Sequence, residues 1–148
     1  MCNKTGKIDK YECLVRLIDS DKKIIQPGHF LPVIKKTRLY HEITKIVLKK
    51  SIENFSETKA GFSINLSMED IINKDLLEYI KKLVDMSGIG PQLTFEILET
   101  ENIEDYKEVQ EFIKDIKRYG CSIAIDDFGT GYSNFVHLMN LDIDYLKI

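Results

Sequence analysis

The sequence predicts an α/β fold in which parallel strands alternate with helices. Short apolar runs of strand length are separated by longer stretches in which apolar residues recur at helical spacing. That alternation is typical of a parallel sheet built from βα units. With 148 residues, 43% of them hydrophobic and 30% charged, the chain has the size and composition of one soluble globular domain.

The first half of the chain predicts two strands and two helices. Residues 11–17 are predicted as a strand, and Pro27 marks a break before a short helix at residues 30–34. Lysines separate apolar residues at helical spacing over residues 43–55, which indicates an amphipathic helix. Residues 62–66 alternate apolar and polar side chains, which is the period of a strand.

The second half continues the alternation. Ser67 begins a helix with a capping arrangement, and a further helix with its apolar face over residues 76–84 stops at Gly88. Residues 93–98 are predicted as the third strand. The remaining expected elements are a helix at residues 103–116, a strand at 121–126, a short helix near 138–141 and a strand from 145 to 148.

Two architectures fit this order of elements, an open doubly wound sheet and a (β/α)₈ barrel. The open dinucleotide-binding sheet needs a glycine-rich turn after its first strand, and none follows residues 11–17. A barrel collects functional residues at the carboxyl ends of its strands, and Asn65, Glu96 and the Asp126-Asp127 pair fall near such ends. We therefore expect a barrel. Because a barrel needs roughly 250 residues, we expect this chain to be part of one.

Composition and charge exclude several function classes. A net charge of −3 gives no basic footprint for duplex nucleic acid. No apolar run approaches the roughly 20 residues of a membrane helix, and the lysine-rich start lacks the apolar core of a signal peptide. We therefore expect a cytoplasmic protein without membrane contact by this segment, although its parent could be tethered to a membrane. The scattered cysteines and histidines show no disulfide or zinc-ligand spacing.

Oxygen donors carry the chemistry that this sequence suggests. A buried apolar strand ends in Asp126 and Asp127, whose adjacent carboxylates repel each other and favour a compensating cation. Glu12, Asn65 and Glu96 converge on the same place if their strands are neighbours. Carboxylate and amide oxygens suit Mg²⁺ or Mn²⁺ better than zinc. The pattern therefore predicts a divalent cation site.

Each of these residues also has a structural interpretation when it is taken alone. Glu12 and Arg16 could form an ion pair on an edge strand, and Asn65 could be a helix-entry residue. The two aspartates could belong to a turn, and Lys147 could be a surface lysine. All of these interpretations would have to hold together, so the combination favours a functional site.

A set of motifs runs through almost the whole chain. They are Glu12-Cys13-Leu14 with Arg16, residues 27–32, 63–67, 95–99, 126–133 and 144–148. In that order they resemble the EAL domain, the family of cyclic di-GMP phosphodiesterases, with Cys13 in place of the signature alanine. The resemblance implies a partial TIM-like barrel of the EAL type, missing its first strand and its C-terminal strands, over residues 1–148.

The resemblance also assigns roles to individual residues. It implies that metals are bound by Glu12, Asn65, Glu96, Asp126 and Asp127. Leu14 and Arg16 are implied to contact the substrate, and the planar guanidinium of Arg16 suits a phosphate. Glu99 is implied to stabilise the loop at residues 128–133.

The implied reaction is hydrolysis of cyclic di-GMP to linear pGpG with Mg²⁺ or Mn²⁺. Metals of this kind activate water and neutralise charge on the phosphodiester. Lys147, together with Glu12, is implied to orient or activate that water, with Lys147 acting as a base if its pKa is depressed. The resemblance further suggests a homodimer and an attached sensory or GGDEF domain in the parent.

The alternative is a catalytically silent EAL-like module that binds cyclic di-GMP or a protein partner. Such modules usually lose a metal ligand, and every ligand that this portion can supply is present, which favours the enzyme. The chain begins at the strand of Glu12 and stops one residue after Lys147, without later residues that support the family's site. We therefore expect the parent to be the phosphodiesterase and the isolated chain to be weakly active or inactive.

Overall fold

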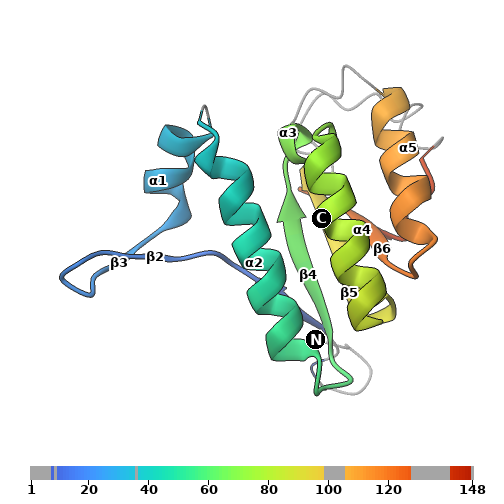
Figure 1. Cartoon of the computed structure of the whole chain (residues 1–148), viewed down its shortest axis with the longest axis horizontal. Coiled ribbons are helices and arrows are strands. Elements are labelled where there is room, and N and C mark those ends of the chain that lie inside the picture. Colours follow the sequence, from blue (N-terminus) through green and yellow to red (C-terminus); the bar gives the residue numbers. More distant parts are fainter. Residues whose placement is uncertain (1–7, 9, 36, 99–105, 128–140, 148) are drawn as a thin grey trace.

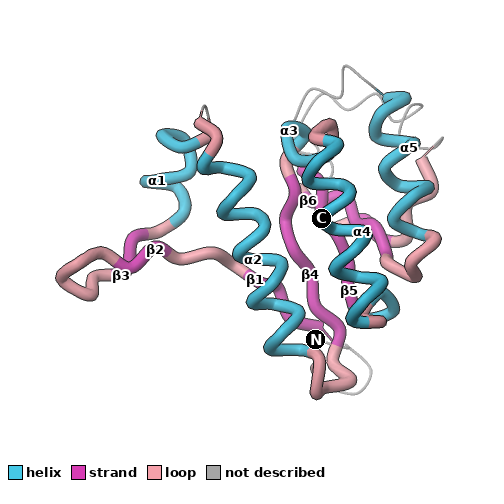
Figure 2. Tube along the Cα trace, viewed as in Figure 1, coloured by secondary structure: helices cyan, strands magenta, loops and turns pink. Residues whose placement is uncertain are grey.

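A parallel sheet organises the computed structural model, which describes residues 8, 10–35, 37–98, 106–127 and 141–147. The five strands of this sheet are, in spatial order, β1 (Lys10–Cys13), β4 (Gly61–Leu66), β5 (Leu93–Leu98), β6 (Ser122–Asp126) and β7 (Tyr145–Leu146). Every neighbouring pair in it is parallel. The α/β fold with a parallel sheet that the sequence predicts is therefore confirmed (Figure 2).

Helices lie between the first four of these strands in the sequence, and most of them pack against one face of the sheet (Figure 1). They are α1 (Pro27–Ile34), α2 (Leu39–Phe55), α3 (Met68–Ile71), α4 (Lys74–Ser87) and α5 (Tyr106–Lys117), with a short 3-10 helix η1 (Gly90–Gln92) before β5. In Figure 1, α2, α4 and α5 stand in front of the sheet, whereas α1 lies to one side of it. None of the helices in the described part of the chain is long and apolar enough to cross a membrane.

The first predicted strand is wrong in its extent. β1 ends at Cys13, so Arg16 lies outside the sheet rather than within a strand over residues 11–17. The chain instead forms an antiparallel hairpin of β2 (Leu17–Ile18) and β3 (Ile24–Ile25). Strands of two residues are too short to show a periodic pattern, which is why the sequence did not predict this hairpin.

Two predicted helix signals are confirmed. The Ser67 hydroxyl accepts the backbone N–H of Asp70, and the Asp70 carboxylate accepts the backbone N–H of Ser67, which forms a capping box. This helix stops at Ile71, and Asn73 caps the separate helix α4. The left-handed residue Gly88, with φ of 65°, ends α4 as expected.

The hydrophobic core lies between the sheet and the helices. Phe62 of β4 stacks on Phe55 of α2 with ring centroids 4.5 Å apart, and Phe95 of β5 meets Phe112 of α5 edge-on at 6.1 Å. Phe62, Phe95 and Phe112 are at most 1% exposed. Alternate side chains of each strand therefore point toward the helices, and the side chains between them point to the opposite face of the sheet. Two predicted helices lie partly outside the described residues: the helix near 138–141 at residues 138–140, and the helix at 103–116 at its first residue, Ile103.

Gly90 should be required for packing between η1 and the turn that follows α5. A Cβ at Gly90 would overlap the backbone carbonyl of Tyr119, so the two segments would have to separate. Gly90→Ala should lower the free energy of unfolding by about 1–3 kcal/mol in a urea titration. Gly28→Ala is the matched control, because a Cβ there meets nothing within 4 Å. Equal stability of the two variants would contradict this packing.

Candidate active site

The register of the sheet places the predicted site residues on one face. Glu12 of β1 is paired with Ser63 of β4, and Asn65 of β4 is paired with Glu96 of β5. Asp126 is paired with Leu98, two residues beyond Glu96 on β5. Residues that are paired in neighbouring parallel strands, or that are two positions apart on one strand, point to the same face of the sheet. These donors therefore lie on the face of the sheet away from the hydrophobic core. A slip of one residue would turn a strand's donor into the core, so this register is essential to the site.

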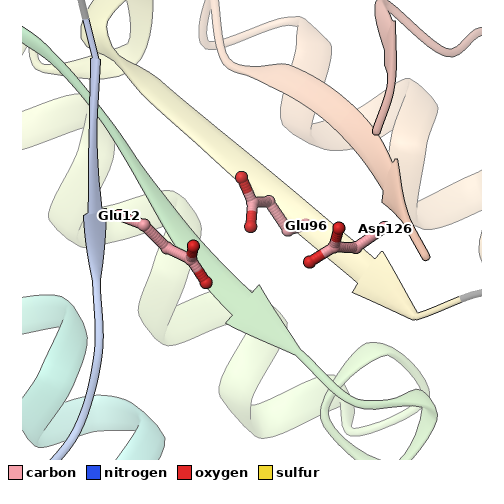
Figure 3. A group of neighbouring side chains, drawn as sticks. All are labelled: Glu12, Glu96 and Asp126. Carbon is pink, nitrogen blue, oxygen red and sulfur yellow. The ribbon is translucent and has the colours of Figure 1, made fainter. Parts of the chain in front are cut away.

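Three carboxylates converge on this face near the carboxyl ends of the strands (Figure 3). Oxygen atoms of Glu12, Glu96 and Asp126 all lie within 4.8 Å of one another. Glu96 is buried, Asp126 is partly buried and Glu12 is exposed, so the cluster is open on the side of β1. Glu12 and Glu96 line a hollow of about 690 Å³, to which residues of all five strands of the sheet contribute.

Lys147, which follows β7, inserts its ammonium group between the carboxylates. Nζ donates to Glu96 Oε2 at 2.7 Å and to Asp126 Oδ2 at 3.0 Å, and lies 3.8 Å from Glu12 Oε2. Burial by itself lowers the pKa of Lys147, but its hydrogen bonds to Glu96 and Asp126 outweigh that effect and raise the pKa above its ordinary value. In this arrangement the side chain is a charged donor and not a base.

Asn65 completes the cluster on the side of β1. Its Nδ2 donates to Glu12 Oε1 at 2.9 Å, which orients the Glu12 carboxylate across the boundary between β1 and β4. The oxygen of the same amide is a further hard donor. Glu12, Asn65, Glu96, Asp126 and Lys147 are thus brought together, although they are spread over almost the whole sequence.

Three other predicted site residues in the described part of the chain are not part of this cluster. Asp127 follows the end of β6 with φ of 57°, is exposed and is not among the three converging carboxylates. The Arg16 guanidinium donates to the carbonyl of Val15 at 2.8 Å, and Leu14 is 53% exposed. Roles for Asp127, Arg16 and Leu14 stay predictions. Glu99 and the loop at residues 128–133 lie outside the described residues.

Lys10, which the sequence did not single out, also lines the hollow. Lys10 of β1 places Nζ 4.5 Å from the ring centroid of Tyr145 on β7, so side chains of the two outermost strands meet across the curved sheet. Burial lowers the pKa of Lys10. Alternation along β1 could have found it, because Lys10 shares the face of Glu12.

Asp144 holds the segment that carries Lys147. Its carboxylate accepts the backbone N–H of Ile123 at 2.8 Å and the ammonium of Lys117 at 3.0 Å. The backbone N–H of Lys147 donates to the carbonyl of Ile125 at 2.9 Å. These bonds attach β7 to β6 and to α5, and so determine where the Lys147 side chain enters the carboxylate cluster.

The order of these residues and their strands is that of a known family. The pattern of the EAL domain matches residues 1–148, the whole chain. The chain belongs to the EAL family. The resemblance seen in the motifs is therefore confirmed.

Several curated relatives of this EAL chain are named cyclic di-GMP phosphodiesterases. Cyclic di-GMP phosphodiesterase PdeF of Escherichia coli (strain K12) is 32% identical over 144 residues, which cover 93% of this chain and 19% of that protein. Cyclic di-GMP phosphodiesterase PdeA of Borreliella burgdorferi is 30% identical over 145 residues, which cover 94% of this chain and 22% of that protein. The chain thus spans about a fifth of the length of these relatives.

Solved EAL structures share the fold. The PaMucR phosphodiesterase in complex with c-di-GMP gives a TM-score of 0.84 at 27% identity, covering 93% of this chain and 58% of that one. The FimX EAL domain from Pseudomonas aeruginosa bound to c-di-GMP gives 0.87 at 24% identity, covering 97% and 60%. The predicted TIM-like fold of the EAL type is confirmed by this likeness.

Proposed function

We propose that this EAL chain supplies catalytic residues of a cyclic di-GMP phosphodiesterase that forms linear pGpG. The observation that carries the proposal is the convergence of Glu12, Glu96 and Asp126 around Lys147. The names of the relatives support the substrate. Because the chain spans only part of those proteins, the activity is proposed for the protein that contains it.

The chemistry of the donor set fits a divalent cation. Three carboxylates and one ammonium leave two negative charges uncompensated, which one divalent cation would balance. Carboxylate and amide oxygens are the ligands that Mg²⁺ and Mn²⁺ prefer. Glu12, Asn65, Glu96 and Asp126 would hold the ion, and Asp127 is proposed to join them. A bound ion would lower the pKa of water and stabilise charge on the phosphodiester oxygens.

The other residues are proposed to bind the substrate and orient the water. Lys147 donates hydrogen bonds here, so we assign it to hold the attacking water or a phosphoryl oxygen by donation. Arg16 is exposed and close in sequence to Glu12, and its guanidinium would grip a phosphate once it leaves the Val15 carbonyl. Leu14 would contact the nucleotide through its exposed apolar side chain.

The test is product formation from cyclic di-GMP. Two samples would each be incubated with cyclic di-GMP and Mg²⁺ or Mn²⁺. One is the 148-residue chain, and the other is the longer protein that contains it, which we call the continued chain. Chromatography should show pGpG from the continued chain, and chelation of the ion should stop its formation. Failure of the continued chain to form pGpG in either ion would overturn the enzymatic proposal.

The alternative in that case is a silent module, which would bind cyclic di-GMP without turnover. Calorimetry of the same samples separates the two, because binding with no pGpG is the signature of the module. Homodimerisation and an attached sensory or GGDEF domain also stay predictions.

A further inference from the structure

A buried carboxylate lies behind the active site and is not used by the proposed chemistry. Asp70 is 1% exposed. Its Oδ2 accepts the backbone N–H and the hydroxyl of Ser67 at 3.1 and 3.0 Å. Its Oδ1 accepts the Thr44 hydroxyl at 3.0 Å and lies 3.1 Å from Nδ1 of His41. We call these four residues the Asp70 clamp.

The Asp70 clamp joins two parts of the fold. His41 and Thr44 belong to the first half of α2, whereas Ser67 is the residue that follows β4. Thr44 and Ser67 are 7% and 5% exposed, so the hydrogen bonds between them and the carboxylate are shielded from water. Each carboxylate oxygen is directed to one of these two elements. A buried charge held this way is costly to disturb, so the clamp defines one position of α2 relative to the end of β4.

The end of β4 is where the active site begins. Asn65 lies two residues before Ser67, and its side chain donates to Glu12. Asn65 is exposed and Glu12 stands on the outermost strand β1, so neither side chain is held by core packing. A shift of the backbone at Ser67 would pass directly to the Asn65–Glu12 hydrogen bond.

We propose that Asp70 is a positioning residue that, through Thr44, His41 and Ser67, holds Asn65 and Glu12 in the geometry that binds a divalent cation. The inference rests on the proposed function only for the identity of the ion. Asp70 itself touches neither substrate nor ion in this assignment. Its effect would be on the affinity for the ion and on the environment of Asn65.

Thr44→Val tests the clamp without removing the capping box. Valine has the shape of threonine and lacks the hydroxyl, so the Thr44 bond to Oδ1 is lost while the His41 contact and both Ser67 bonds remain. Mn²⁺ binding to the 148-residue chain would be measured by electron paramagnetic resonance, counting only the binding that Asp126→Asn removes. Replacing a residue that hydrogen-bonds a metal ligand typically weakens metal binding about 10–100-fold. The clamp bonds no proposed ligand directly and acts through the backbone between Ser67 and Asn65, so we expect roughly 3–10-fold weaker binding.

Three further variants separate positioning from a loss of stability. His41→Leu removes the other α2 partner at a half-buried position and should weaken Mn²⁺ binding in the same direction. Thr44→Ser keeps the hydroxyl and should restore native affinity. Asn73→Ala is the matched stability control, since it removes the cap of α4, which bonds Leu76 and not Asn65. It should lower the melting temperature and leave Mn²⁺ affinity unchanged.

The side-chain amide of Asn65 gives a readout that needs no ion. In ¹⁵N–¹H spectra its signal should shift in Thr44→Val and His41→Leu, and stay in place in Thr44→Ser and Asn73→Ala. An unshifted signal with native Mn²⁺ affinity in both α2 variants would overturn the clamp alone. Absence of Mn²⁺ binding sensitive to Asp126→Asn in the native chain would instead overturn the cation site, and with it this inference.

Discussion

Asp126→Asn should lower the rate of cyclic di-GMP hydrolysis in the continued chain by roughly a hundredfold or more. The Asp126 carboxylate is one of three that converge, and it accepts Lys147 at 3.0 Å. Asparagine keeps the shape and removes one negative charge, so the cluster would no longer balance a divalent ion together with Lys147. Loss of about 3 kcal/mol of stabilisation corresponds to a decrease of roughly a hundredfold or more in turnover.

The measurement is the initial rate of pGpG formation at saturating Mn²⁺. Asp85→Asn is the control, because it makes the same chemical change on an exposed residue of helix α4, which does not belong to the carboxylate cluster. We expect Asp85→Asn to retain the native rate. Activity of Asp126→Asn within a few-fold of the native protein would show that the ligand assignment is wrong.

Lys147→Met should separate ion binding from turnover. The ammonium lies among the carboxylates that we assign to the ion, so its removal leaves the cluster more negative. Mn²⁺ should therefore bind about as tightly as before or somewhat more tightly, with a gain of no more than about 1 kcal/mol since Lys147 is partly exposed. Turnover should fall roughly 10²–10⁴-fold, because the donor that holds the water or phosphoryl oxygen is lost.

Calorimetry with Mn²⁺ and the rate of pGpG formation measure the two effects on one preparation. Lys49→Met is the control, since Lys49 is exposed on α2 and lies 3.9 Å from its nearest carboxylate partner, Glu53. A parallel loss of ion affinity and turnover in Lys147→Met would contradict the assignment, because it would make the lysine a support for the ion.

The prediction of the elements succeeded where a signal was local. β5 spans residues 93–98 as predicted, since Leu93, Phe95 and Ile97 alternate with the polar residues Thr94 and Glu96 at the period of a strand. The capping box at Ser67 and the glycine end of α4 also follow from residues a few positions apart. The prediction failed at residues 11–17, where the apolar pattern continues through the end of β1 into the hairpin. Nothing local distinguishes one strand from two short ones.

In the site, too, local features were predictable from the sequence and long-range contacts were not. Its oxygen donors were recognisable by residue type and by their place after apolar runs. The contact between Lys147 and the carboxylates was not, because Lys147 is 51 positions from Glu96 and meets it only through the pairing of β7 with β6. Lys10 was missed since one lysine on a short strand resembles a surface residue.

The sequence by itself determined the alternation of strands and helices, the EAL family and the oxygen donors of the site. These depend on residue type and on spacing along the chain. Only the tertiary structure decided the register that puts Glu12, Asn65, Glu96 and Asp126 on one face, the entry of Lys147 among them and the burial of Asp70 against Thr44. Those contacts join residues far apart in sequence, so they depend on how strands pair and helices pack, which no local pattern encodes.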